Sequence, residues 1–336
     1  MAFVDRMMPA PVGGGFAMED YWVWCGSVIR GDDARYHMYA ARWPKRYPFF
    51  DGYRLYSEIV HAVSPTPVGP YTMADVALPP RGEAFWDGRM THNPTIHRHG
   101  DTYLLFYIGS TWTGPEVGPQ EIATSPKPDA SYAAIRIGLA TSRSLDGPWE
   151  RRDAPILLPR PGKWDGTIVT NPAPCVLGDG RILMLYRSNT PDGLRIGAAI
   201  ADSPSAPFER LSDEPVLQLT DGNFVEDPFV WWSGGHLELL AKDMTGGLTG
   251  EFHAGVHLTS TDGVRWTPSS PAKAYSRRVV WGDGSVTVQG SLERPQLLIE
   301  DGRPTHLFAA TADGPGGFRH AANTWNMVIP LAGGID

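Results

Sequence analysis

A short polar signature recurs five times along the 336-residue chain, each time in front of an apolar run. The copies are Glu19-Asp20-Tyr21, His92-Asn93-Pro94, Thr170-Asn171-Pro172, Glu226-Asp227-Pro228 and Glu293-Arg294-Pro295. Each apolar run leads through a polar turn, often with Gly, into a second run and then a third. A repeat of this kind restricts the fold strongly, because equivalent segments must be arranged in a ring or along a line.

The segments that follow each signature have the pattern of antiparallel strands. Short apolar or aromatic runs alternate with clusters of Gly, Pro, Asp and Asn, and helical periodicity is almost absent. Units of three to four strands recur about every 60 to 80 residues, which predicts an all-β fold, a five-bladed β-propeller that spans residues 1–336 as a single domain. The last unit ends with the chain, so we expect a strand from near the N-terminus to close the ring. A β-sandwich whose hairpins are similar by chance is the alternative.

Long connections interrupt the strand pattern at residues 43–55, 109–135 and 275–291. Loops of this length are usually functional or mobile. In a propeller they lie on the two faces, and we expect the second one to form a rim or lid over one end of the axis.

Composition argues against two classes of partner. The chain has 29 Lys and Arg against 37 Asp and Glu, a formal net charge of -8, whereas nucleic acids and anionic membranes bind basic patches. No apolar run is long enough to cross a membrane as a helix. Residues 1–16 lack the pattern of a secretory signal, and Cys25 and Cys175 are interpreted as buried free thiols, so a cytoplasmic location is expected.

The signatures themselves are the main candidates for chemistry. In a propeller the first strand of each blade runs along the central channel, so side chains at its opening face one another across the axis. The aligned first positions are Glu19, His92, Thr170, Glu226 and Glu293, and the next positions are Asp20, Asn93, Asn171, Asp227 and Arg294. Carboxylates in one pocket can be separated in pKa by burial and repulsion, and such a pair is what glycosidic bond hydrolysis requires. Alternatively, these side chains cap strands or bind backbone within turns.

A second repeated element is an Asp-Gly pair upstream of three signatures, at Asp87, Asp165 and Asp221, with Trp86 and Trp164 in front of the first two. Asp87 and Asp165 are candidates for binding sugar hydroxyls, and the tryptophans for stacking on a sugar ring. Asp-Gly is also a common turn pair and tryptophan a common packing residue, so a structural role is the alternative.

These features together resemble the five-bladed β-propeller glycoside hydrolases, the broad set around families 43, 62, 32, 68, 117 and 130, with family 43 nearest in motif. That family has Asp-Pro in the first blade for the general base, Asp-Pro in the third for a pKa-modulating aspartate, and Glu-Gly-Pro in the fourth for the general acid. Here Glu226-Asp227-Pro228 matches the acid motif in position, Asp20 stands where the base belongs, and Asn171 replaces the modulator. The resemblance covers nearly the whole chain as architecture, and the departures imply a divergent member or a separate family.

The resemblance implies an exo-acting, inverting glycoside hydrolase that acts on an oligo- or polysaccharide. Glu226 is then the general acid and Asp20 the general base, with Glu293 as the rival for either role. The expected substrate-binding residues are Glu19, Trp86, Asp87, His92, Asn93, Trp164, Asp165, Asn171, Asp227 and Arg294. No cofactor is required, but some proteins of this group hold a calcium ion on the axis, and His253 is the candidate ligand for it.

Two other functions stay possible at this point. A glycoside phosphorylase of the same fold would require phosphate, which Arg42, Lys45 and Arg294 are candidates to bind. A carbohydrate-binding propeller without catalysis would keep the aromatic side chains and tolerate loss of the acid.

Overall fold

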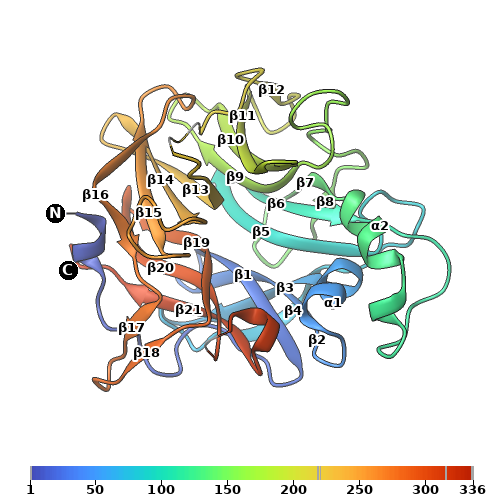
Figure 1. Ribbon diagram of the computed structural model, residues 1–336, viewed down its shortest axis with the longest axis horizontal. Helices are drawn as coiled ribbons and strands as arrows, with labels where there is room; N and C mark the ends of the chain where they lie inside the picture. The colour runs from blue at the N-terminus through green and yellow to red at the C-terminus, as the bar shows by residue number, and fades with distance from the viewer. Residues whose placement is uncertain (1, 218, 220, 315, 334–336) are drawn as a thin grey trace.

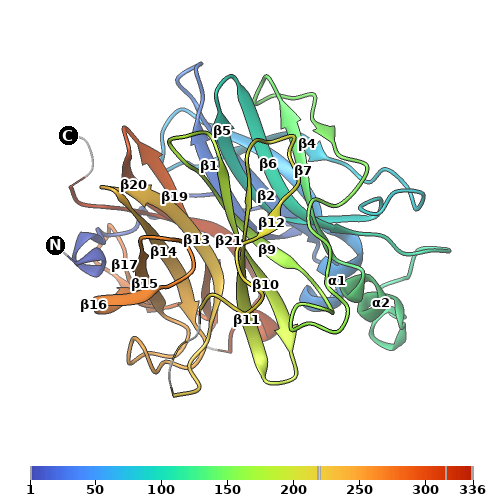
Figure 2. The ribbon, with the colours of Figure 1, turned by 90° about the horizontal axis from the view of Figure 1, so that it is seen from above.

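The computed structural model describes residues 2–217, 219, 221–314 and 316–333. Its main strands form five antiparallel sheets that stand in a ring around a central axis (Figure 1). The predicted five-bladed β-propeller is thereby confirmed. The same ring seen at right angles shows two short helices beside it at one edge (Figure 2).

Four blades have four strands each, ordered from the axis outward. Blade one consists of β1 (Tyr21–Arg30), β2 (Tyr36–Pro44), β3 (Glu58–Ser64) and β4 (Thr72–Leu78), and blade two of β5 (Met90–His99), β6 (Thr102–Ser110), β7 (Arg136–Ser142) and β8 (Glu150–Arg151). Blade three consists of β9 (Thr170–Val176), β10 (Ile182–Thr190), β11 (Gly193–Ala201) and β12 (Glu209–Arg210), and blade four of β13 (Val225–Ser233), β14 (His236–Asp243), β15 (Gly255–Ser260) and β16 (Thr267–Tyr275).

Blade five is completed by the start of the chain. Its own strands are β19 (Ser291–Glu300), β20 (Arg303–Ala312) and β21 (Thr324–Pro330). Phe16 and Asn326 exchange two backbone hydrogen bonds of 2.9 Å, and Met7 forms a bridge to Leu331. The N-terminal segment therefore pairs with β21, as expected, although through isolated bridges rather than a regular strand.

The apolar cores lie between neighbouring blades. Successive side chains on a strand point to opposite faces, so on the second strand of each blade one residue enters the core on one side and the next enters the core on the other. The pairs are Met38–Tyr39, Leu105–Phe106, Met184–Leu185, Leu239–Leu240 and Leu307–Phe308. Because both faces of these strands are covered, their sequences are continuous apolar runs instead of alternating ones.

Each first strand carries a bulge at the signature. The pairing with the second strand shifts register there in all five blades. One residue in each bulge has a φ between 51 and 57°: Cys25, Asn93, Asn171, Asp227 and Arg294. A bulge bends the strand and redirects a side chain, so the signature lies within the strand rather than in front of it.

The first blade differs from the predicted alignment. Its bulge holds Trp24-Cys25-Gly26, further along the chain than the triplet that begins at Glu19. Glu19 and Asp20 are exposed before β1 and line a surface cavity beside Tyr71. The placement of Asp20 and Glu19 at the axis is therefore wrong, because their resemblance to the other triplets is one of residue type only.

The Trp-Asp-Gly element of blade three is structural. Asp165 is fully buried and accepts hydrogen bonds from Arg160 and Tyr186 at 2.9 Å each and from Arg210 at 2.7 Å. Trp164 stacks on Tyr186, with 6.0 Å between ring centroids. This arrangement ties the loop before β9 to the outer strands of the same blade.

Blade two repeats the arrangement. Asp87 is fully buried and accepts hydrogen bonds of 2.7 Å from Arg81 and Tyr107, while Trp86 stacks on Tyr107 at 6.0 Å. The third aspartate, Asp221, is exposed. Since neither Trp-Asp pair lines the cavity at the axis, the prediction that these four residues bind sugar is corrected.

Short helices occupy two of the long connections. α1 (Phe49–Tyr56) follows β2, and α2 (Lys127–Ala133), preceded by the 3-10 turn η2 (Ile122–Thr124), packs against it (Figure 1). Smaller elements are η1 (Phe3–Arg6), η3 (Phe318–His320) and the hairpin of β17 (Arg278–Val280) and β18 (Val286–Val288). No helix in the described part of the chain has the length and apolar character needed to span a membrane.

The close approach of Gly197 to Tyr186 predicts an effect on stability. A Cβ at Gly197 would lie 2.4 Å from the Tyr186 ring, and the ring is held by its hydroxyl bond to Asp165. We expect Gly197→Ala to lower the free energy of unfolding by roughly 1–3 kcal/mol. Gly178→Ala, at an exposed hairpin position with no atom within 4 Å of the added Cβ, should change it by less than about 0.5 kcal/mol. Urea denaturation followed by tryptophan fluorescence measures both, and equal effects would contradict the packing argument.

Candidate active site

A cavity of about 630 Å³ lies at the axis, at the end of the ring where the signatures are found. Bulge residues of all five blades line it, with Trp24 from blade one, together with side chains from α1, from α2 and from the segment of η3. Its size is within the range of ligand pockets, roughly 300–1,000 Å³. The cavity is therefore the place where the repeated residues converge.

The five bulge residues form a row of hydrogen bonds around the axis. The Cys25 thiol donates to Asn93 Oδ1 at 2.7 Å, and Asn93 Nδ2 donates to Asn171 Oδ1 at 2.8 Å. Asn171 Nδ2 donates to Asp227 Oδ1 at 2.8 Å, which also accepts from Arg294 Nη1 at 3.1 Å. All five side chains are buried, and the four bonds join blades one to five in order.

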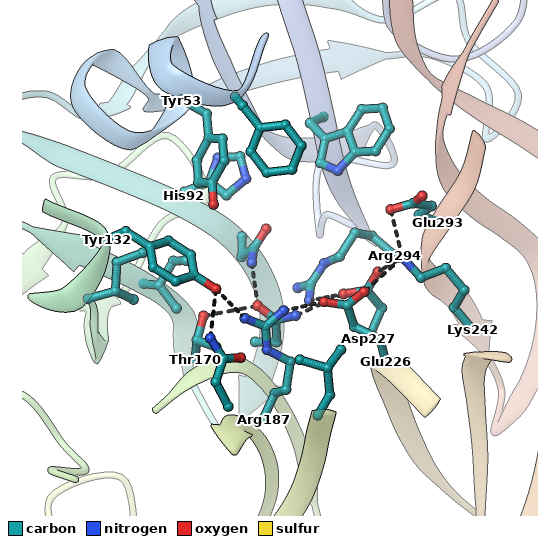
Figure 3. Close-up of a pocket in the computed structure, with 18 of the residues that line it drawn as sticks. Tyr53, His92, Tyr132, Thr170, Arg187, Glu226, Asp227, Lys242, Glu293 and Arg294 are labelled. Atoms are coloured by element: carbon teal, nitrogen blue, oxygen red, sulfur yellow. Dashed lines mark hydrogen bonds and ion pairs between the residues drawn. The ribbon is translucent and has the colours of Figure 1, made fainter. Parts of the chain in front are cut away.

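Three carboxylates share one ammonium group on the side of blades four and five. Lys242 Nζ, on β14, lies 2.8 Å from Glu226, 2.9 Å from Glu293 and 3.6 Å from Asp227, and its side chain is only 4% exposed. Arg187, on β10, forms an ion pair with the other oxygen of Glu226. Figure 3 shows the three carboxylates gathered on one side of the cavity.

The two glutamates differ in pKa. Burial raises the pKa of Glu226, but the charges and hydrogen bonds of Lys242 and Arg187 outweigh it and lower that pKa to about 2. Glu293 is also buried, and it pairs with Lys242 but not with Arg187. Burial and the neighbouring carboxylates Asp227 and Glu226 hold the pKa of Glu293 above its ordinary value. One carboxylate is thus ionised while the other keeps its proton to higher pH, which is the separation that acid–base chemistry uses.

His92 lies on the opposite side of the cavity (Figure 3). Burial, together with the charge of Arg294, lowers its pKa to about 3, so the imidazole is neutral. Its Nδ1 is 2.8 Å from Ser57 Oγ, and its ring stacks on Tyr53 with 4.9 Å between centroids. These contacts fix the ring as part of the wall.

Aromatic side chains of α1 and η3 continue this wall. Phe49 contacts Trp24 edge-on, with centroids 5.1 Å apart, and stacks on Phe318 at 5.0 Å. Aromatic faces of this kind suit the apolar face of a sugar ring.

Of the residues 109–135 that were expected to form a rim, Tyr132 and Ile135 line the cavity. Tyr132 of α2 reaches it, and its hydroxyl accepts hydrogen bonds from Arg187 at 2.7 Å and from Asn189 at 3.2 Å. The same arginine that holds Glu226 is thereby fixed by the rim.

Eight of the predicted site residues line the cavity: His92, Asn93, Asn171, Glu226, Asp227, His253, Glu293 and Arg294. The other six lie outside it: Glu19, Asp20, Trp86, Asp87, Trp164 and Asp165. The signatures did not indicate Arg187 or Lys242, which stand on second strands. A signal was present, because each is a single cation directly after an apolar run of its strand.

The residues around the axis do not fit a calcium ion. Calcium binds about six to eight oxygen ligands, whereas the groups here include the guanidinium of Arg294 and the ammonium of Lys242, and both already contact Asp227. His253 lines the cavity with its ring stacked on Phe252, 3.8 Å between centroids.

Comparison with known proteins gives similarity of structure only. Neither a protein-family model nor a curated protein matches the chain. A protein described as a glycoside hydrolase has a TM-score of 0.69 at 16% identity, over 97% of this chain and 92% of the other. A family 117 glycoside hydrolase from the marine bacterium Zobellia galactanivorans has a TM-score of 0.65 at 15% identity, with 97% and 88% covered.

A thermostable family-43 glycoside hydrolase has a TM-score of 0.62 at 14% identity, over 97% of this chain and 92% of the other. Identities this low establish a common fold and a wide divergence in sequence. The chain is similar to these glycoside hydrolases in having their five-bladed β-propeller.

Proposed function

We propose that the protein is a glycoside hydrolase in which Glu293 is the general acid and Glu226 is its ionised partner. The observation that carries this proposal is the pair of glutamates with opposite pKa shifts in the axial cavity. A carboxyl group with a raised pKa is suited to protonating the leaving oxygen. The assignment differs from the role of Glu226 that the resemblance implies, because two cations hold Glu226 without a proton.

The spacing of the two glutamates favours retention of configuration. Lys242 contacts one oxygen of each at 2.8 and 2.9 Å, so these oxygens lie within about 6 Å of each other. Retaining enzymes separate their carboxyl groups by about 5–5.5 Å and inverting ones by about 6.5–9.5 Å. In addition, the bulge of blade one carries Cys25 where a carboxylate base would be expected.

The reaction then has two steps. In the first, Glu293 gives its proton to the leaving oxygen while a carboxylate oxygen of Glu226 bonds to the anomeric carbon, which releases the leaving alcohol and forms a glycosyl ester. In the second, the Glu293 carboxylate takes a proton from water, the resulting hydroxyl bonds to the anomeric carbon, and Glu226 leaves as a carboxylate.

The form of the cavity supports action at the end of a glycan. Four of the bonded bulge residues line it, namely Asn93, Asn171, Asp227 and Arg294, and so do side chains of α1 and α2. A sugar that enters from the open side meets an aromatic wall on one flank and the carboxylates on the other (Figure 3). A terminal residue fits this arrangement better than the middle of a polymer.

A carbohydrate-binding propeller without catalysis is the second candidate. The observation in its favour is that blade one supplies no carboxylate to the axis and that Glu226 is already paired with two cations. A phosphorylase has less support, because Arg42 pairs with Glu58 at 2.8 Å and Lys45 with Asn323 at 2.8 Å, both away from the cavity. Hydrolysis that proceeds equally without phosphate would exclude it.

Removal of either glutamate tests the function directly. The purified protein is first assayed on aryl glycosides and on plant, algal and microbial oligosaccharides. On the glycan that is cleaved, we expect Glu293→Gln and Glu226→Gln each to lower kcat by roughly 10²- to 10⁴-fold. Asp20→Asn should retain activity, because Asp20 is exposed outside the cavity. Loss of activity in Asp20→Asn alone would reverse this assignment, and sugar binding without any product would favour the binding propeller.

Stereochemistry tests the two-step reaction. We expect proton NMR of the first product, recorded before mutarotation, to show the same anomer as the substrate. The opposite anomer would show that water attacks directly, and Glu226 would then not be the nucleophile.

The shared ammonium group predicts a pH effect. Activity requires Glu226 ionised and Glu293 protonated, so it is lost at low pH as Glu226 gains a proton and at high pH as Glu293 loses one. Lys242 lowers the pKa of both groups, so Lys242→Gln should move both limbs of the kcat/KM profile to higher pH. Carbon-13 NMR titration of labelled glutamates measures the same shifts without a substrate, and unchanged pKa values would contradict the electrostatic argument. Circular dichroism checks folding first, because a broken buried ion pair costs about 3–5 kcal/mol.

A further inference from the structure

A second cluster of titratable side chains lies at the other end of blade one. His37 stands near the start of β2, where it pairs with Ile29, whereas Trp43 near the other end of β2 lines the cavity. His37 and His61 of β3 are each 1% exposed, and Asp146 lies in the turn between β7 and β8. One ligand atom from each of these three residues lies within 4.8 Å of the others. The proposed glycosidase chemistry makes no use of them.

One buried ring nitrogen of this cluster has no hydrogen-bond partner. His37 Nε2 lies 3.1 Å from Asp33 Oδ1, and His37 Nδ1 lies 2.9 Å from His61 Nε2. Two neutral imidazoles supply both of these hydrogen bonds when each carries its proton on Nε2. His61 Nδ1 is then a lone pair that faces Asp75 Oδ1 at 3.6 Å without a partner. A buried acceptor left unpaired beside a carboxylate is costly.

We propose that the cluster binds a divalent transition-metal ion of the zinc class, with His37 Nδ1, His61 Nε2 and Asp146 as ligands. A metal between the two nitrogens takes the place of the proton that they share. Each imidazole then directs its remaining N–H to a carboxylate, His37 to Asp33 and His61 to Asp75. Ligating histidines in proteins commonly have this carboxylate partner, which fixes the tautomer.

Metal binding requires the two imidazole rings to turn relative to each other. The rings lie nearly in one plane, 8° apart with centroids 5.1 Å and nitrogens 2.9 Å apart, so the two nitrogens face each other head-on. Zinc binds imidazole nitrogen at about 2.0–2.1 Å, so two nitrogens in a tetrahedral site stand about 3.3 Å apart with their lone pairs directed at the ion. Two imidazoles and a carboxylate are a common ligand set for this ion. The fourth position is left for water.

The surroundings hold these ligands in place. Tyr39 stacks on His61 with 5.1 Å between centroids, and its hydroxyl donates to the backbone oxygen of Leu145 at 2.5 Å, next to Asp146. The charged groups at the cluster are three carboxylates and Arg35, which pairs with Asp33. The excess of negative charge favours a cation. Because Asp146 belongs to blade two, the ion would join blades one and two far from the cavity.

Metal binding to the untagged full chain tests the proposal. The protein is stripped with a chelator and titrated with Zn²⁺ by calorimetry and with Co²⁺ by visible absorption. We expect one ion per chain, a cobalt spectrum of tetrahedral type, and a higher melting temperature with Zn²⁺. A wild-type protein that binds neither ion would overturn the proposal, and the histidine pair would then be a hydrogen-bonded contact only.

Variants locate the ion. His61→Gln and Asp146→Asn should each weaken Zn²⁺ binding by at least about tenfold, and Asp75→Asn by roughly 10- to 100-fold through His61. Asp146 is exposed, so its variant is expected to fold even where a histidine variant does not. Unchanged affinity in Asp146→Asn and His61→Gln would rule this site out.

Blade four provides a matched control. His257 also pairs with a carboxylate, with Nε2 2.7 Å from Glu238 and Nδ1 3.0 Å from Ser269 Oγ. Both ring nitrogens have partners, so His257→Gln should leave Zn²⁺ binding unchanged. An equal loss in this variant would indicate binding at scattered histidines rather than at the cluster.

Discussion

A residue of left-handed conformation in each innermost strand is the constraint on which the rest of the structure depends. Outside glycine such residues cost of order 1–3 kcal/mol and persist only where their surroundings hold them. Here the surroundings are the other blades. A thiol and a guanidinium donate, two amides donate and accept, and one carboxylate accepts. This order of donors and acceptors requires different residues at equivalent positions, so a symmetric fold contains an asymmetric site.

The pKa values of the cavity glutamates depend on cations carried by the second strands of the blades. Glu226 and Glu293 occupy the same position in neighbouring blades and share Lys242, yet only Glu226 also meets Arg187. Arg187 adds to the effect of Lys242 on Glu226, whereas burial and the carboxylates Asp227 and Glu226 raise the pKa of Glu293. The second strands otherwise supply apolar residues to the cores. Here they also carry the cations that influence the protonation of glutamates on the first strands.

The sequence predicted the architecture well and the site in part. Repetition and apolar runs are signals spread over many residues, so five blades and the role of the chain's start in ring closure were evident. The prediction for blade one was wrong because its bulge, Trp24-Cys25-Gly26, has no polar signature, whereas an unrelated Glu19-Asp20 pair precedes the strand. The Trp-Asp-Gly element does recur, but its aspartates accept hydrogen bonds from Tyr107 and Tyr186 and do not bind a ligand in the cavity. The sequence cannot distinguish an aspartate that binds a ligand from one that bonds to a neighbouring side chain. Arg187 and Lys242 reach the site through pairing across strands, which no local pattern shows.

The pairing of residues 7–16 with β21 has a consequence for the order in which the molecule is assembled. During synthesis the first residues leave the ribosome long before Thr324–Pro330 exist, and domains generally fold as units as the chain emerges. The first four blades can form their own sheets in that interval, but the start of the chain must wait without its partner. Closure is therefore a late event that depends on the last strand, and a chain stopped before β21 leaves an open ring in which Met8 and Phe16 lack their hydrogen bonds to that strand.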